Sequence, residues 1–264
     1  MNAISAVIIT KNEERNIKRC LDSIKTVADE IIVVDSHSTD NTVAICRAAG
    51  ARVIEQDWLG YGPQKNTGNN AAAYDYILSM DADEALDEDL IQAIAEEKQK
   101  GLKGVYQLSR LNYYYGKFIK HGAEYPDKKI RLFNRREVHW DERPVHETLH
   151  VQPGLHHKQL KGHLLHYTYY RFEEHILKSN MYTTLAAQDY FRRGKKAPAY
   201  KIIFSPLVAF VQSYFIKRGF LDGMHGLVLA VMNAHASFMR YVKLWEMNSV
   251  KKGNQSSNLI NRNQ

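Results

Sequence analysis

Short apolar runs and stretches of helical periodicity alternate through the first hundred residues. Four apolar runs are typical of buried strands: 4–9, 31–34, 52–55 and 76–80. Four further stretches have a helical pattern or composition: 12–24, 40–48, 66–74 and 87–100. Asn12 and Asp40 are expected to cap the first two of these helices. The order predicts an α/β fold with a Rossmann-like, mostly parallel sheet and right-handed crossovers.

Polar clusters follow three of the predicted strands, at the point where each strand ends: 10–14, 35–40 and 81–84. The carboxyl ends of neighbouring parallel strands meet at one edge of a sheet, which is where open α/β sheets bind ligands. Helix capping would explain any one cluster, but three together indicate a shared site. No Gly-x-Gly-x-x-Gly follows the first strand, so a dinucleotide-binding site is disfavoured.

Asp81 and Asp83 stand two residues apart where the fourth apolar run ends. Carboxylates are hard oxygen ligands that suit Mg²⁺ or Mn²⁺ bound to a diphosphate. Aspartate pairs are also common in surface turns, so this pair gains its weight from the polar clusters upstream.

Four segments resemble glycosyltransferase family 2 of the GT-A fold, in the family's order: 6–13, 33–40, 62–66 and 80–84. Three later segments resemble the subgroup of bacterial lipopolysaccharide-core β-glucosyltransferases: 125–127, 131–135 and 144–147. The resemblance implies a nucleotide-diphospho-sugar transferase that inverts the sugar. Its expected donor is a UDP-sugar, with glucose the expected hexose, and its expected acceptor is the lipopolysaccharide core or another lipid-linked glycan.

The resemblance also implies roles for individual side chains. Residues at the strand ends and beyond would hold the nucleotide-sugar: Thr10, Asn12 and Glu13 along the nucleotide, Asp35 at the uracil edge, Lys65 at the diphosphate or nucleotide, and Asp81 at the ribose or donor sugar. Asp83 would ligate Mg²⁺ or Mn²⁺. Arg131 lies in an alternating, strand-like stretch and could clamp phosphate oxygens with its guanidinium group.

An inverting transfer needs a base for the proton of the acceptor hydroxyl. In the subgroup's pattern a His-Glu pair stands where the base is expected, and Glu147 is the first candidate. Asp141 and Glu142 are alternatives, because Glu147 could instead pair with a nearby arginine. His146 is either a packed side chain or a second metal ligand beside Asp83. The run 113–115 is three tyrosines, which suit either an acceptor platform or core packing.

From Phe172 onward the pattern is helical. The apolar stretches 202–216 and 220–239 are both interrupted by polar residues, so neither is a clean transmembrane span. With the basic cluster 192–196 they predict a membrane-associating helical extension that contacts anionic lipid. A solvated loop or a helical homo-oligomer interface would explain the same pattern. The expected organisation is a catalytic domain over 1–171, in halves 1–100 and 101–171, a helical region over 172–250 and a disordered tail over 251–264.

The formal net charge is distributed unevenly along the chain: it is −8 over residues 1–100 and +15 over residues 101–264. A basic half suits phosphates, an acidic membrane or nucleic acid. No nucleic-acid module is recognised, so a basic nucleic-acid-binding protein without catalysis is only an alternative. A sugar nucleotidyltransferase is a second alternative, disfavoured by the acidic loop 12–14. Two cysteines and no recognisable signal peptide favour a cytoplasmic protein, peripheral on the inner face of the plasma membrane.

Overall fold

The computed structural model describes the backbone of residues 2–141 and 148–260, and the side chains as far as residue 250. The chain forms two compact units. The sheet unit comprises Met1–Asn112 and Asp127–Thr168, and the helical unit comprises Tyr113–Pro126 and Tyr169–Gln264. The division into domains made from the sequence stays a prediction.

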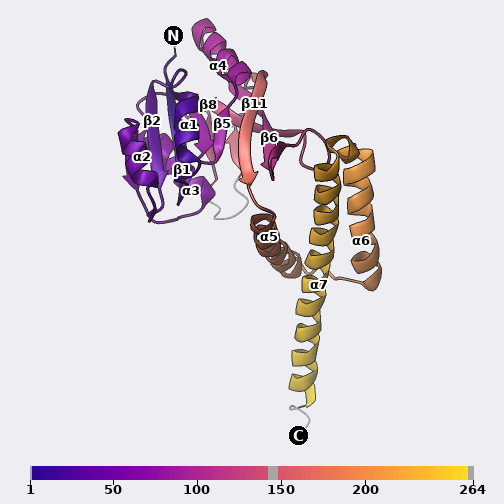
Figure 1. The fold of residues 1–264 in the computed structure, drawn as a ribbon. Coiled ribbons are helices and arrows are strands. Elements are labelled where there is room, and N and C mark those ends of the chain that lie inside the picture. Colours follow the sequence, from indigo (N-terminus) through magenta and orange to yellow (C-terminus); the bar gives the residue numbers. More distant parts are fainter. Residues whose placement is uncertain (1, 142–147, 261–264) are drawn as a thin grey trace. The chain divides into compact units, whose positions relative to one another are not determined.

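The first half of the sheet unit is parallel, as predicted. Its strands are β1 (Ile4–Thr10), β2 (Glu30–Asp35), β3 (Arg52–Glu55) and β4 (Tyr76–Asp81), in the order β3-β2-β1-β4 (Figure 1). Each of the pairs β1·β2, β1·β4 and β2·β3 is parallel. The α/β fold class is therefore confirmed.

The later strands extend this sheet in antiparallel fashion. They are β5 (Glu84–Leu86), β6 (Val105–Tyr114), β7 (Lys117–Phe118), β8 (Asp127–Asn134) and β11 (His157–Tyr169). In the described part of the chain the sheet has nine strands, continuing from β4 through β8, β6 and β11 to β5, with β7 paired to β6. A separate pair is formed by β9 (Val138–Trp140) and β10 (Leu149–Val151). The short strand β5 matters most for the site, because it follows Asp83 directly.

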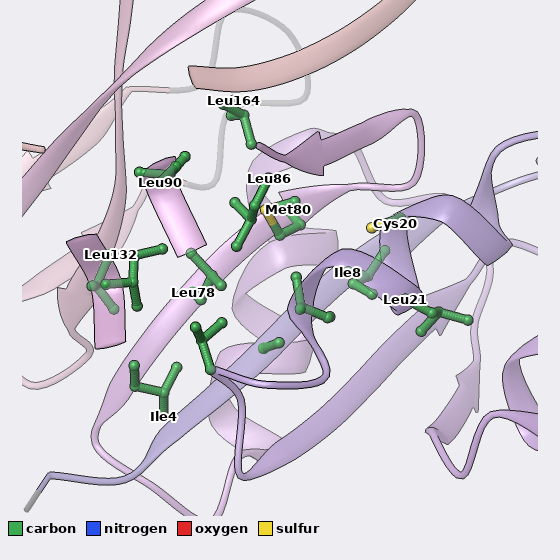
Figure 2. Packing of buried hydrophobic residues seen from close by; sticks show 14 of the residues in the cluster. Ile4, Ile8, Cys20, Leu21, Leu78, Met80, Leu86, Leu90, Leu132 and Leu164 are labelled. Atoms are coloured by element: carbon green, nitrogen blue, oxygen red, sulfur yellow. The ribbon is translucent and has the colours of Figure 1, made fainter. Parts of the chain in front are cut away.

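Helices cover both faces of the parallel strands. Side chains of α1 (Ile17–Ile24), α2 (Thr42–Ala48) and α4 (Glu88–Lys100) pack on one face, and α3 (Tyr61–Ala71) lies on the other. Figure 2 shows Leu21 of α1 and Leu90 of α4 in the same buried cluster as Ile8 and Leu78 of the strands. Burial of these apolar faces fixes the strands and hence the position of their carboxyl ends.

Two helix boundaries differ from the sequence prediction. Asn12 does not cap a helix: its φ is 53°, a left-handed conformation that asparagine tolerates, and α1 begins only at Ile17. The third helix runs over Tyr61–Ala71 instead of 66–74, because its close packing on the sheet outweighs the weak helix propensity of Gly62 and Gly68. Asp40 does accept a hydrogen bond at the start of α2, from the amide of Thr42 at 3.0 Å.

The helical unit contains α5 (Phe172–Arg192), α6 (Ala199–Val211), a π-helical turn (Gln212–Ile216), a 3₁₀ turn (Gly219–Asp222) and α7 (Met224–Ile260). Buried Asp222 joins the segment 113–126 to these helices by accepting hydrogen bonds from the amides of Lys120 and His121. Among the described residues one helical stretch, Ala199–Ile216, is long and apolar enough to cross a membrane by length and composition. Helix α7 extends to Ile260 and so enters the stretch 251–264, whose disorder stays a prediction.

Candidate functional site

Three of the predicted site residues lie side by side at the carboxyl edge of the sheet. Thr10 ends β1 and is in register with Asp35 at the end of β2. Asp81 ends β4 and is in register with Ile9, the residue before Thr10. The strand ends therefore meet at one edge, as the polar clusters predicted. The hydroxyl oxygen of Thr10 is buried there and has no hydrogen-bond partner in the described part of the chain.

Asp81 is held by two cations from other elements. Lys65 of α3 lies 3.1 Å from one carboxylate oxygen, and Arg131 of β8 donates to the other at 2.7 Å. Burial alone would raise the pKa of Asp81, but Arg131 and then Lys65 outweigh it and hold the pKa well below its ordinary value. Asp81 is therefore ionised at every physiological pH. The ammonium group of Lys65 also lies 4.6 Å from the ring centre of Trp140.

A buried layer of charge supports Asp81. The same nitrogen of Arg131 donates to Glu84 at 2.6 Å, and Glu84 accepts a hydrogen bond from the amide of Asp81 at 3.0 Å. Burial would lower the pKa of Arg131, but Asp81 and Glu84 raise it above its ordinary value. Arg110 adds a weaker contact to Glu84 at 3.6 Å and a short one to Asp127 at 2.6 Å. This network of ion pairs and hydrogen bonds holds the Asp-x-Asp turn in place on its buried side.

Asp83 faces a histidine that the sequence analysis did not single out. The Nε2 atom of His166, in β11, lies 3.3 Å from the carboxylate of Asp83. On the other side of the ring, Nδ1 lies 2.6 Å from the side-chain oxygen of Asn112. The hydroxyl oxygen of Thr168 also lies 3.0 Å from Nδ1, and the tautomer of His166 decides which ring nitrogen carries the proton. A neutral ring protonated at Nδ1 would offer the lone pair of Nε2 to a metal ion beside the carboxylate of Asp83.

The residues present fit a divalent cation. A carboxylate with an imidazole is a donor set that Mn²⁺ accepts, and a carboxylate with substrate phosphates is typical of Mg²⁺. Asn112 orients the imidazole in the way that outer partners orient metal-bound histidines. The described residues contain no group of three or more His, Cys, Asp or Glu side chains placed to bind a metal. Asp83 and His166 would thus be two ligands, leaving other positions to a diphosphate and water.

The loops after β1 and β2 are tied to each other. The amide of Asn12 donates to the Ser38 hydroxyl at 2.8 Å, and the Asn12 side-chain oxygen accepts from the amide of Thr39 at 2.8 Å. Fully buried Asp35 accepts hydrogen bonds from the amide and the hydroxyl of Ser38. The amide of Glu13 donates to the Thr42 hydroxyl at 2.8 Å. The loops are thus ordered next to Thr10, and the nucleotide contacts of Asn12, Glu13 and Asp35 stay predictions.

Only one of the candidate bases lies in the described part of the chain. Asp141 directly follows Trp140, whose ring contacts Lys65, and its amide donates to the carbonyl of Thr148 at 3.0 Å. Glu142, His146 and Glu147 fall outside the described residues. The choice between Glu147 and Asp141 as the base, and the metal role of His146, therefore stay predictions.

His166 and Glu84 are the site residues that the sequence analysis missed. Glu84 was visible in the motif 80–84, but nothing local distinguished it from a solvated acid. His166 is one of three histidines in β11, and only the antiparallel pairing of β11 with β5, which sets His166 opposite Glu84, brings it to Asp83. A pairing over some eighty residues leaves no local signal in one sequence.

Comparison with known proteins now identifies the family. The model of glycosyl transferase family 2 matches residues 5–160, which is more than half of the chain. An uncharacterised glycosyltransferase of Rickettsia typhi is 34% identical over 99% of this chain and 93% of its own length. The chain belongs to glycosyl transferase family 2.

This family-2 glycosyltransferase is also 31% identical to the lipopolysaccharide core biosynthesis glycosyltransferase LpsC of Rhizobium meliloti, over 94% of each chain. The resemblance to the family and to the lipopolysaccharide-core subgroup is thereby confirmed, and the nucleotidyltransferase and non-catalytic alternatives do not hold. Among solved structures, residues 1–349 of S. aureus TarS in complex with UDP are 15% identical over 95% of this chain and 92% of that chain, with a TM-score of 0.46. The sequence matches carry the assignment.

Proposed function

We propose that this glycosyltransferase moves a hexose, with glucose the expected sugar, from a UDP-sugar to a lipopolysaccharide-core or other lipid-linked acceptor. The transfer inverts the sugar and uses Mg²⁺ or Mn²⁺. The observation that carries the proposal is the pair of Asp83 and His166 beside the ion-paired Asp81, at the carboxyl edge of the sheet. The similarity to LpsC, whose name gives lipopolysaccharide core biosynthesis, supports the acceptor.

Asp83 and His166 would hold the cation. When bound, it supplies positive charge against the negative charge that grows on the departing UDP. The rest of the site follows from the chain itself. Because Lys65 and Arg131 keep Asp81 ionised, its carboxylate is a fixed acceptor for hydroxyl groups of the ribose or donor sugar. The unpartnered hydroxyl of Thr10 offers a further contact to the nucleotide.

The acceptor hydroxyl gives its proton to a carboxylate, with Glu147 the first candidate and Asp141 the second. A base that is correctly placed contributes about 10²–10⁴-fold to the rate. The acceptor oxygen then attacks the anomeric carbon from the face opposite UDP, so the bond to UDP breaks as the new glycosidic bond forms.

Calorimetric titration with UDP, in the presence and absence of Mn²⁺, tests the proposal without needing the acceptor. We expect Mn²⁺ to strengthen UDP binding by the wild-type protein. Asp83→Asn and His166→Ala should each weaken Mn²⁺-dependent binding by about tenfold or more, because each removes a metal ligand.

His157→Ala is the matched control, since His157 is exposed at the start of the same strand and should leave UDP binding unchanged. Wild-type protein that does not bind UDP would refute the proposed donor. Equal binding with and without Mn²⁺, or in His166→Ala, would refute the metal role alone. A panel of UDP-sugars scored for stabilisation against heat would then identify the hexose.

For the location we propose that the helical unit docks on an anionic membrane surface at the cytoplasmic face. Large apolar side chains lie exposed on one face of α6 and the π-helical turn: Tyr200, Ile203, Phe204, Leu207, Val208, Val211 and Phe215. Their spacing of three and four residues makes this a continuous stripe, called here the apolar face. The opposite side of α6 packs along α7. A helix with one packed side and one bare apolar side suits a position in the plane of the interface.

Basic residues stand at both ends of the apolar face. Arg192, Arg193, Lys195 and Lys196 precede α6, and Arg218 follows the π-helical turn; all five are exposed. Cations next to an exposed apolar helix complement anionic lipid headgroups. This charge pattern favours a membrane over a second copy of the chain, since two identical basic rims would repel each other.

A further inference from the structure

A cavity of about 490 Å³ lies wholly within the helical unit. Its walls come from α5, the junction of α6 with the π-helical turn, α7 and the segment 113–126. The volume falls in the range of sites for small molecules. The residues proposed to bind UDP and metal all belong to the sheet unit, and none of them is among the described residues that line this cavity.

Polar and apolar atoms contribute about equally to the cavity lining, which is a larger polar share than most small-molecule sites have. Hydroxyl and amide side chains from three helical elements face it: Ser179, Thr183, Gln212, Ser213, Asn233 and Ser237. Tyr114, Tyr169 and Tyr182 add aromatic rings with hydroxyl groups. Among the described lining residues, the aliphatic side chains are those of alanines and Met232. Such a lining suits a polyhydroxylated ligand better than a lipid chain.

Two cations in the lining have no carboxylate partner among the residues that the structure describes. Neither Arg240 nor Lys217 forms an ion pair within the described part of the chain. Arg240 instead lies 5.4 Å from the ring centres of Tyr190 and Tyr241, and its Nε atom is buried without a hydrogen-bond partner. Asn233, on the same helix, likewise has a buried side-chain nitrogen without a partner. Donors without acceptors in a polar cavity favour a ligand rich in oxygen.

The remaining titratable groups leave the cavity with a positive balance. Glu124 is the one carboxylate among the described lining residues, and it already accepts a hydrogen bond from the Tyr114 hydroxyl at 3.0 Å. Burial, and then Glu124, raise the pKa of Tyr114, so this hydroxyl stays a donor. Burial lowers the pKa of His175 to about 4, so its ring is neutral at pH 7. Arg240 and Lys217 thus outnumber Glu124 in charge.

We propose that this cavity binds an anionic saccharide, a sugar ring that bears a phosphate or a carboxylate. Arg240 and Lys217 meet the anionic oxygens, and the hydroxyl and amide side chains hydrogen-bond the ring hydroxyls. The binding itself is independent of the proposed function. Its use rests on that function, because the anionic sugar is then part of the acceptor substrate.

Ligand-observed NMR titration of the full-length protein tests the binding with four simple probes: glucose 6-phosphate, glucuronate, glucose and inorganic phosphate. We expect one or both anionic sugars to bind about tenfold more tightly than glucose and than inorganic phosphate, since only they satisfy both the cations and the hydroxyl groups. Preference for glucose 6-phosphate would assign a phosphate, and preference for glucuronate would assign a carboxylate.

Arg240→Gln should weaken binding of the preferred probe by about tenfold or more. Arg192→Gln is the matched control, because Arg192 belongs to the same unit but does not line the cavity; it should bind the probe like the wild type. Should Arg240→Gln fail to fold, Asn233→Asp serves instead: it keeps the side-chain size, adds a negative charge to the lining and should weaken binding of the anionic probe.

Binding of UDP with Mn²⁺ is measured on the same samples. If UDP binds but no anionic sugar binds at millimolar concentration, or if Arg240→Gln binds the sugar like the wild type, the cavity proposal is wrong and the proposed function stands. If the anionic sugar binds in an Arg240-dependent manner and UDP does not, the cavity proposal stands and the proposed function is wrong.

Discussion

At the scale of single residues, Asp81 and Asp83 have different surroundings although they belong to one motif. Asp81 is the last residue of β4 and forms ion pairs with Lys65 and Arg131, so these two cations already balance its negative charge. Asp83 lies in the turn before β5, and among the described residues its carboxylate pairs with His166 at 3.3 Å. Asp83 is therefore the better candidate for a metal ligand, whereas Asp81 is suited to accept hydrogen bonds from hydroxyl groups.

The ion pairs of Asp81 predict how the stability of Asp81→Asn depends on pH. The folded-state pKa of Asp81 lies below its ordinary value of 3.8, so the carboxylate stabilises the fold above pH 3.8 and loses this effect as the pH falls through the folded-state pKa. At pH 7 the variant leaves Lys65 and Arg131 short of a partner and should lose about 2–3 kcal/mol of unfolding free energy. Urea unfolding at a series of pH values measures this difference.

Asp75→Asn is the control for this experiment. Asp75 is more exposed and pairs with Arg135 and Arg136 near the surface, so its replacement should change the unfolding free energy by less than about 1 kcal/mol. The explanation fails if the cost of Asp81→Asn is as small, or if that cost does not shrink below pH 3.8.

Residue-level prediction succeeded where a motif and a strand end coincide, and failed where partners come from distant strands. Thr10, Asp35 and Asp81 were placed at one edge because each ends an apolar run. The partnership of Asp83 with His166 was missed because it depends on antiparallel pairing of β5 with β11. The assignment of Asn12 as a cap was wrong because side-chain type alone does not reveal a positive φ.

At the scale of elements, α3 packs unusually close to the sheet. A Cβ atom at Gly68 would lie 2.3 Å from a methyl carbon of Val7 in β1 and 3.1 Å from one of Val34 in β2. Only glycine allows this approach. Because α3 also carries Lys65, the short distance between helix and sheet determines how Lys65 reaches Asp81.

Gly68→Val should destabilise the protein by at least about 2 kcal/mol, because the added methyl groups force α3 away from the sheet. Thermal and urea unfolding measure the loss. UDP affinity should fall as well, since Lys65 moves with the helix.

Asn70→Ala is the control on the same helix, where the exposed side chain should be replaced with little change in stability. Adding Val7→Ala to Gly68→Val should recover part of the lost unfolding free energy, because it removes the methyl carbons of Val7 that the new side chain would overlap. If Gly68→Val is as stable as the wild type, or the second substitution recovers nothing, the close contact does not hold α3 in place.

Element prediction was most accurate for the buried strands. An apolar run that is buried on both faces has a clear beginning and end, and the ends of β1 to β4 lie within one residue of the predicted ranges. The helix over 61–71 was predicted over 66–74, so its predicted start was five residues too late and its predicted end three, because Gly60 and Gly62 suggest a loop and only packing on the sheet makes this segment helical. Strand β5, with three residues, is too short to leave a pattern.

At the scale of the whole molecule, the apolar face predicts binding to anionic membranes. Phe204, Leu207 and Val208 are each 58–63% exposed. They therefore contribute little to the free energy of folding, but their burial would contribute much to the binding of any surface that covers them. Replacing all three with serine should greatly reduce sedimentation with vesicles that contain phosphatidylglycerol, while the melting temperature stays within a few degrees of that of the wild type. Added salt should weaken wild-type binding, because the basic ends of the apolar face contribute through charge.

The control variant carries Leu177→Ser and Met181→Ser, which remove exposed apolar side chains from α5 in the same unit. It should still sediment with the vesicles, since α5 lies outside the apolar face. Analytical ultracentrifugation of the triple-serine variant and the wild type, both without lipid, separates a membrane from a second copy of the chain. A wild-type dimer that becomes a monomer when the three residues are replaced would assign the apolar face to self-association. A wild-type monomer that sediments with vesicles only when the apolar face is intact would assign it to the membrane and keep the transferase beside a lipid-linked acceptor.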